Sequence, residues 1–215
     1  MSGGLGGSAA SSVGGAFAAA LAMDADPNVN EIIAAALQGE MAVAGCHLDN
    51  IAPSVYGGLT LARSVRPIDV IALPVHAPWM LALVTPNVRV QTKTAREVLP
   101  STSGRALWVQ QMANTAAVVH AFASGDRELL RRAFDDRYAE PRRASLIPHF
   151  NDVKHAAIET GALGCAISGS GPTVVAICED ESMATKVCAA MQHAFGDVKS
   201  SAPVSPIARR GVRAA

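Results

Sequence analysis

Aromatic residues and charged residues are both scarce in this 215-residue chain. Phe, Trp and Tyr make up 4% of it and charged residues 17%, and the 18 basic residues are balanced by 18 acidic ones. Because there is no basic excess, we do not expect nucleic-acid binding through bulk charge. Because aromatic residues are scarce, the core must be built mainly from Ala, Val, Leu and Ile, which suits helices lying on sheets. The length permits one large domain or two small ones.

Membrane-spanning, secretory and zinc-binding patterns are also missing. Apolar runs such as 116–123 are far too short to cross a bilayer, and the N-terminus lacks the basic flank and apolar segment of a signal peptide. The six histidines show no HExxH or HxH spacing, so a zinc site has no support. Cys46, Cys165, Cys178 and Cys188 form no CxxC pair and lie in apolar stretches. We expect buried free thiols in a reducing cytoplasm.

Hydrophobic periodicity predicts helices followed by strands in the first part of the chain. Helices are expected over 8–23 and 29–45, a loop over 46–58, and strands over 59–63, 68–75 and 80–86. Gly14 and Gly15 would allow the first helix to pack closely on a neighbour. The strand over 80–86 is almost wholly apolar, so we expect it to be buried on both faces.

The rest of the chain has the pattern of an α+β domain. We expect helices over 103–125, 126–136, 147–162 and 181–196, two strands joined by a Gly/Ser turn within 164–180, and a closing strand within 197–205. No internal repeat is present. A boundary near residue 77 would divide the chain into domains 1–77 and 78–215.

Glycine is concentrated at the start of the chain, which reads MSGGLGGSAASSVGG over residues 1–15. Glycines directly before a helix let backbone N–H groups approach an anion without interference from a Cβ atom. The free N–H groups of the first turn and the helix dipole both favour negative charge at this point. The sequence therefore predicts a phosphate site in residues 3–11.

Several kinds of glycine-rich segment must be told apart here. A Walker loop needs a lysine, and no lysine precedes Lys93. Gly4, Gly6 and Ala9 match the dinucleotide fingerprint, but that motif follows a strand and lies in a βαβ unit, which is not predicted here. Taken alone, this segment is also compatible with a flexible chain terminus that has no binding function.

The loop GGLGGSAAS, residues 3–11, resembles the phosphate loop of the small-molecule kinases that act on galactose, homoserine, mevalonate and phosphomevalonate. GCAISGSGPTVVAI, residues 164–177, resembles the third motif of the same superfamily. Three further segments resemble the homoserine kinase branch in particular: HLDNIAPSVYGG (residues 47–58), TKTAREVLP (residues 92–100) and AEPRRASLIP (residues 139–148). The resemblance runs from residue 1 to about 205, with these motifs in order.

The resemblance implies a two-domain α+β kinase fold. The chain would hold part of an N-terminal domain like the second domain of ribosomal protein S5, followed by a ferredoxin-like C-terminal domain. The implied reaction is the ATP- and Mg²⁺-dependent phosphorylation of the L-homoserine hydroxyl in threonine biosynthesis. A cytoplasmic location, a homodimer and no nucleic-acid or membrane partner are implied too. Mevalonate and galactose remain alternative substrates.

The resemblance also assigns the nucleotide-binding residues. The phosphates of ATP would be bound by Gly3, Gly4, Leu5, Gly6, Gly7, Ser8, Ala9, Ala10 and Ser11. Ser8 and Glu40 would hold Mg²⁺, because a carboxylate in an apolar helix needs a partner and Mg²⁺ prefers oxygen ligands. Without the resemblance, Glu40 would more often be an ordinary solvated helix residue. The family usually has a serine where this chain has Gly7, which removes one hydroxyl from the loop.

Other residues are assigned to homoserine and to support of the loop. Arg96 and Arg143 would bind the substrate carboxylate, which calls for a planar guanidinium. Asn50, with His47 and Asp49 beside it, would orient the acceptor hydroxyl, although Asn50 could instead form an Asx turn before Pro53. Ser168, Gly169, Ser170 and Gly171 would support the phosphate loop. No catalytic base is expected, because phosphoryl transfer depends mainly on positioning and charge.

The family has about a hundred residues ahead of this loop, so we expect the chain to be a truncated product or a fragment. Expressed alone, it is expected to have little or no kinase activity, and a non-catalytic phosphate-binding remnant is the alternative function. The intact mass of the native protein separates these cases, because a species about 10 kDa heavier would mean that translation starts further upstream.

Overall fold

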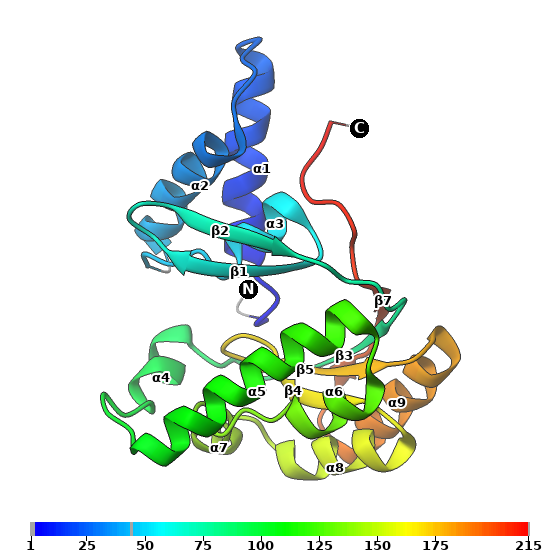
Figure 1. The fold of residues 1–215 in the computed structure, drawn as a ribbon. Helices are drawn as coiled ribbons and strands as arrows, with labels where there is room; N and C mark the ends of the chain where they lie inside the picture. The colour runs from blue at the N-terminus through cyan, green and yellow to red at the C-terminus, as the bar shows by residue number, and fades with distance from the viewer. Residues whose placement is uncertain (1–2, 44, 215) are drawn as a thin grey trace. The chain divides into compact units, whose positions relative to one another are not determined.

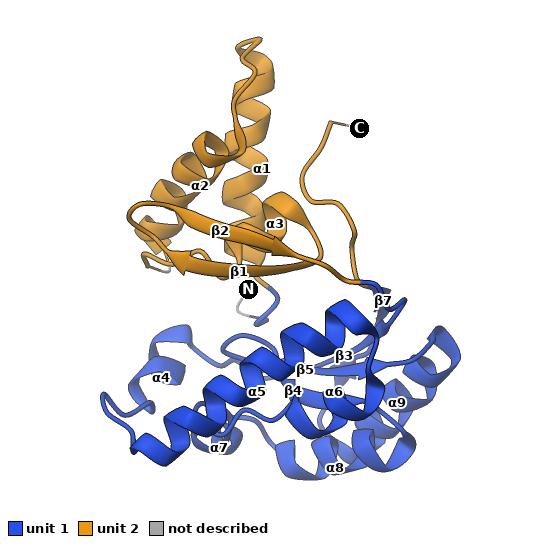
Figure 2. Ribbon diagram, in the orientation of Figure 1, with its two compact units in different colours: residues 1–5, 76–206 blue, residues 6–75, 207–215 orange. Residues whose placement is uncertain are grey.

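The computed structural model describes residues 3–43 and 45–214. These residues form two compact units (Figure 2): residues 3–5 with 76–206 make up unit 1, and residues 6–75 with 207–214 make up unit 2. The division into domains at residue 77 stays a prediction, and the units differ from it in where the two chain ends belong. The α+β class is confirmed.

Unit 2 combines helices with a β-hairpin (Figure 1). Its elements are α1 (Gly7–Ala22), α2 (Val29–Val43), α3 (Ile51–Tyr56), β1 (Leu59–Ser64) and β2 (Asp69–Leu73). The two strands are antiparallel, with Leu61 opposite Ile71. The core of this unit includes Val13, Ile32, Ile33, Leu37, Leu48 and Ile51.

The close approach of α1 and α2 uses a glycine other than the expected pair. A Cβ atom on Gly14 or Gly15 would meet nothing within 4 Å among the described residues. On Gly39 of α2, a Cβ atom would instead lie 2.9 Å from the Ser12 hydroxyl of α1. The buried side of α1 carries Ala9, Val13 and Ala20. The prediction of close packing at Gly14 and Gly15 was therefore wrong, because they do not share that side.

The segment expected to be a loop contains the short helix α3. Pro53 is compatible with it because it lies in the first turn, where a missing N–H costs no helical hydrogen bond. The helix ends at Gly57, which has a φ of 75°. The C-terminal segment packs here: the Val212 N–H donates to the Ser54 carbonyl at 2.9 Å. The pattern missed α3 because six residues are too few for a helical period.

Unit 1 is built on an antiparallel sheet with the strand order β4-β5-β3-β6, and β7 also pairs with β3. The strands are β3 (Met80–Pro86), β4 (Gly164–Ile167), β5 (Val174–Cys178), β6 (Ser200–Ser201) and β7 (Val204–Pro206). Helices α8 (Phe150–Thr160) and α9 (Glu181–Ala194) pack on this sheet (Figure 1). The turn between β4 and β5 is the Gly/Ser turn that the sequence predicted.

Burial along β3 alternates, contrary to the expectation that both faces would be buried. Ala82 and Val84 are inaccessible and belong to the core shared with α8 and α9, whereas Leu81 and Leu83 are partly exposed. An antiparallel sheet needs only one covered face, and that explains the difference.

The remaining helices of unit 1 are α4 (Thr92–Glu97), α5 (Arg105–Ser124), α6 (Arg127–Ala133), α7 (Glu140–Arg143) and the 3₁₀ turn η1 (Ala144–Leu146). Asp126 caps α6 by accepting the Leu129 N–H at 2.9 Å, and Asp180 caps α9 through the Met183 N–H at 2.8 Å. The helices α4 and α7 were not predicted. Within the described ranges, no helix combines the length and the apolar character needed to cross a membrane.

Three of the cysteines are buried as expected, but Cys46 is exposed. It follows α2 at the surface of unit 2, so the expectation for this thiol was wrong. Burial raises the pKa of Cys165 and Cys178 to about 12, and it also raises that of Cys188. The buried thiols therefore stay protonated and unreactive at neutral pH.

This difference predicts the labelling pattern of the thiols. The native protein should react with a maleimide at Cys46 alone, and all four thiols should react in denaturant. Mass spectrometry of tryptic peptides identifies the labelled positions. Labelling of Cys165 as fast as that of Cys46 would contradict the packing of the sheet described above.

Candidate functional site

The first residues of the glycine-rich loop are held by the turn between β4 and β5. The Ser168 hydroxyl donates to the Gly4 carbonyl at 2.8 Å, and the Thr173 hydroxyl donates to the Gly3 carbonyl. Gly4 has a φ of 72°, and a Cβ atom there would clash with the carbonyl of Ser168 and lie 2.9 Å from that of Gly171. Only glycine fits this position without strain.

Gly4→Ala should therefore destabilise the protein by about 2 kcal/mol and lower its melting temperature by about 4–8 °C. The matched control is Gly7→Ala, because a Cβ atom at Gly7 meets nothing within 4 Å in the described chain. Gly7 also lies in α1, where alanine is favoured. Equal melting temperatures for the two variants would show that the turn does not constrain the loop.

The next part of the loop begins α1, in unit 2. The Ser8 hydroxyl donates to Glu40 Oε1 at 2.9 Å, which joins the first turn of α1 to the interior of α2. Glu40 is only 2% exposed, and its Oε2 has no hydrogen-bond partner among the described residues. A buried carboxylate oxygen without a donor is costly and indicates a missing partner. Ser8 and Glu40 can thus offer oxygen atoms to a cation.

The other loop residues differ in their exposure. Leu5 and Ala10 are exposed, whereas Ala9 is buried in the core of unit 2. The Ser11 hydroxyl donates to the Gly7 carbonyl at 3.0 Å, inside its own helix. Backbone N–H groups at the start of α1 are therefore the groups of this segment that could donate to an anion.

The segment before α3 brings another polar group beside this loop within unit 2. A Cβ atom on Gly6 would lie 3.0 Å from Asn50 Oδ1, so the two residues are neighbours. Asn50 precedes α3 but its side chain does not cap the helix. Asp49 makes the local bonds instead: its Oδ1 accepts the Asn50 N–H at 2.9 Å and lies 2.9 Å from His47 Nδ1.

In unit 1, Arg143 is fixed by two backbone carbonyls. Its Nε donates to the carbonyl of Ala95 at 2.8 Å, and its Nη1 donates to that of Gly169 at 3.0 Å. Burial above all, and then the neighbouring Arg96 cation, lower the pKa of the Arg143 guanidinium, while Asp136 opposes them. Arginine stays charged regardless. Two cations at close range favour an anionic ligand.

Sequence reasoning missed two residues that support the loop. The hydroxyls of Thr85 and Thr173 lie 2.7 Å apart, and Thr173 is fully buried where it reaches the Gly3 carbonyl. Thr173 ends the GSGPT segment, and a polar residue at the start of an apolar strand was the available signal. The Ser170 hydroxyl lies 3.4 Å from that of Thr92 in α4, which ties the turn to another predicted substrate segment.

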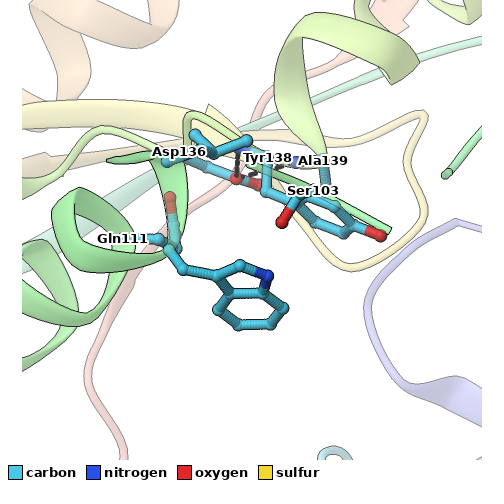
Figure 3. Close-up of a pocket in the computed structure, with 7 residues that line it drawn as sticks. Ser103, Gln111, Asp136, Tyr138 and Ala139 are labelled. Atoms are coloured by element: carbon cyan, nitrogen blue, oxygen red, sulfur yellow. Dashed lines mark hydrogen bonds between the residues drawn. The ribbon is translucent and has the colours of Figure 1, made fainter. Parts of the chain in front are cut away.

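A cavity of about 210 Å³ lies elsewhere in unit 1 (Figure 3). It is lined by Ser103, Leu107, Trp108, Gln111, Asp136, Tyr138 and Ala139. Asp136 is its charged residue, and its oxygens accept the N–H groups of Tyr138, Ala139 and Glu140. This carboxylate is therefore engaged by the backbone at the start of α7.

Comparison with known proteins gives consistent matches. The GHMP kinases N terminal domain matches residues 1–58, and the GHMP kinases C terminal domain matches residues 118–197. The homoserine kinase of Chlorobium phaeobacteroides strain BS1 is 39% identical over 99% of this chain and 68% of its own length. That of Thermococcus kodakarensis is 40% identical over 98% of this chain and 70% of its own length.

A solved structure extends the likeness to the fold. The crystal structure of homoserine kinase from Cytophaga hutchinsonii matches with a TM-score of 0.94 and 39% identity, over 98% of this chain and 68% of that one. The relatives found by sequence and the protein in this crystal structure are all homoserine kinases. The chain belongs to the homoserine kinase family of the GHMP kinases.

Proposed function

We propose that the protein transfers the γ-phosphoryl group of ATP to the side-chain hydroxyl of L-homoserine. The observation that carries the proposal is the Ser8–Glu40 pair, which stands where a glycine-rich loop becomes a helix. The relatives are named homoserine kinases, and the sequence segments that contain Asn50, Arg96 and Arg143 resemble that branch of the family.

The ATP phosphates would bind to the loop 3–11 through backbone N–H groups, where the dipole of α1 adds to the attraction. Mg²⁺ fits Glu40 and Ser8, because Glu40 Oε2 is buried without a partner in the described chain. Phosphate oxygens and water would supply the other ligands, and no cluster of three His, Cys, Asp or Glu side chains exists among the described residues. When bound, the ion neutralises charge on the phosphates.

Homoserine presents a carboxylate, an ammonium group and a hydroxyl. The carboxylate would pair with Arg143 and Arg96, since Arg143 is already oriented by the carbonyls of Ala95 and Gly169. Asn50 would orient the hydroxyl with its side-chain amide, close to Gly6 of the loop. His47 and Asp49 hold that segment in place.

The test is an acceptor panel with the native protein, purified from its own cells after its intact mass has been measured. Homoserine, mevalonate and galactose are each incubated with ATP and Mg²⁺, and ³¹P NMR detects the phosphomonoester. Homoserine alone should give a product. Phosphorylation of another acceptor in preference, or of none while ATP still binds, would overturn the proposal, and the second result would indicate a non-catalytic phosphate-binding protein.

A further inference from the structure

A partly buried ion pair in unit 1 has no part in the chemistry proposed above. The ammonium group of Lys154 in α8 donates to Oε1 of Glu140, and Glu140 is the first residue of α7. Glu140 is 7% exposed, and its Oε2 has no hydrogen-bond partner among the described residues. Burial raises the pKa of Glu140, although the Lys154 cation opposes the shift. Such a pair contributes little net stability compared with apolar side chains of the same size.

The position of the pair suggests another role. Glu140 and Arg143 are the first and last residues of α7, one helical turn apart, so they move together. Asp136 holds the start of this short helix through the N–H groups of Ala139 and Glu140. At the other end, the Arg143 guanidinium lies on the carbonyls of Ala95 and Gly169.

We propose that Glu140 and Lys154 are a positioning pair for Arg143. The ion pair fixes the start of α7 to α8, and the helix then holds the Arg143 guanidinium in a fixed position beside the Gly169 turn. This rests on the proposed function, in which Arg143 binds the substrate carboxylate. Two-point binding of a carboxylate depends on orientation, and a displacement of about 1 Å can cost a hundredfold in rate.

Charges suit this task better than an apolar contact would. A short helix of four residues has little cooperative stability of its own and could shift along an apolar surface. The ammonium–carboxylate contact instead defines a direction and a distance, as buried polar groups do where they specify register. In addition, α8 packs beside β4, the strand that leads into the turn bearing Gly169. The start of α7 and the strand before the Gly169 turn therefore both contact α8.

The kinetic test compares variants of the native protein. Lys154→Met should raise the KM for homoserine about 10-fold or more, with kcat and the KM for ATP within about twofold. Lys154→Arg keeps the charge and should restore most of the homoserine KM. The matched control is Arg127→Met, which removes the exposed ion pair with Glu179 in the same unit. It should leave every constant unchanged.

A merely structural role gives a different result. Loss of stability alone would reduce the folded fraction, and hence the apparent kcat, without changing the KM of the molecules that remain folded. An unchanged homoserine KM in folded Lys154→Met would therefore overturn the proposal. If that variant does not fold, Glu140→Met provides the same test, because it breaks the same contact from the other side while the partly exposed Lys154 ammonium can still reach water. The homoserine KM should again rise about 10-fold or more.

A second measurement does not depend on the substrate. Hydrogen exchange of the Arg143 Nε–H, assigned in ¹⁵N NMR spectra with Arg143→Lys, reports the bond to the Ala95 carbonyl. Lys154→Met should accelerate this exchange about 10-fold or more, and Arg127→Met should not. Faster exchange in a protein that does not phosphorylate homoserine would support the positioning pair and refute the proposed function. Unchanged exchange would refute the positioning pair.

Discussion

Glu40→Gln is expected to lower kcat/KM for phosphoryl transfer by about a thousandfold while the protein stays folded. Glutamine has the same shape and can still accept the hydrogen bond from the Ser8 hydroxyl, so the packing of α1 on α2 is preserved. The loss is the negative charge of a buried carboxylate whose Oε2 has no other partner in the described chain. Homoserine-dependent ADP release at saturating ATP measures the effect.

The control for this experiment lies on the same helix. Glu31 is exposed at the start of α2, where it accepts the Asn28 N–H at 2.9 Å, and glutamine can replace it in such a capping arrangement. Glu31→Gln should therefore be as active as the wild type. Titration with Mn²⁺ and ATP gives a readout besides turnover, because Glu40→Gln should weaken metal binding. If Glu40→Gln keeps a tenth or more of the wild-type kcat/KM, Glu40 is not the metal-binding carboxylate.

Arg143→Ala should raise the KM for homoserine about 30- to 150-fold, with the KM for ATP little changed. The estimate corresponds to the loss of about 2–3 kcal/mol from a charged hydrogen-bonding group. Selectivity should fall as well: a simple alcohol without a carboxylate should be phosphorylated at nearly the same low rate by the variant and by the wild type. Initial rates with both acceptors measure this difference.

The neighbouring arginine is the matched control. Arg142 lies over the Tyr138 ring, 5.3 Å from its centroid, and donates to the Tyr138 carbonyl, so its guanidinium is occupied within unit 1. Arg142→Ala removes the same charge one residue away and should change the homoserine KM less than threefold. Equal losses in the two variants would mean that overall positive charge, and not the placement of Arg143, attracts the substrate.

The long elements could be predicted from the sequence because their apolar periods are clear. The helices α1, α2, α5, α8 and α9 and the strand β3 were each located to within a few residues. Short elements were missed, as α3 and α7 show, since four to six residues cannot display a helical period. The burial of β3 was misjudged because an apolar sequence does not tell whether its neighbours run parallel or antiparallel.

The site was less accessible to sequence reasoning than the fold. The glycine-rich loop indicates an anion by its own chemistry, but Glu40 is 32 positions from Ser8 and only the family resemblance joined them. The roles given to the site residues remain predictions. No local pattern links Glu140 to Lys154 or Thr173 to Gly3, because such contacts depend on how α8 and β5 pack in three dimensions.

The chain passes between the two units at residues 5–6, 75–76 and 206–207. Gly211 lies so close to the carbonyls of Ser54 and Val55 that a side chain would not fit there, which indicates a tightly seated tail. A protease that cleaves the connection at 75–76 would accordingly leave two fragments, 1–75 and 76–215, that stay associated because the C-terminal segment packs on residues 54 and 55. Neither unit can be cloned as one uninterrupted stretch of gene.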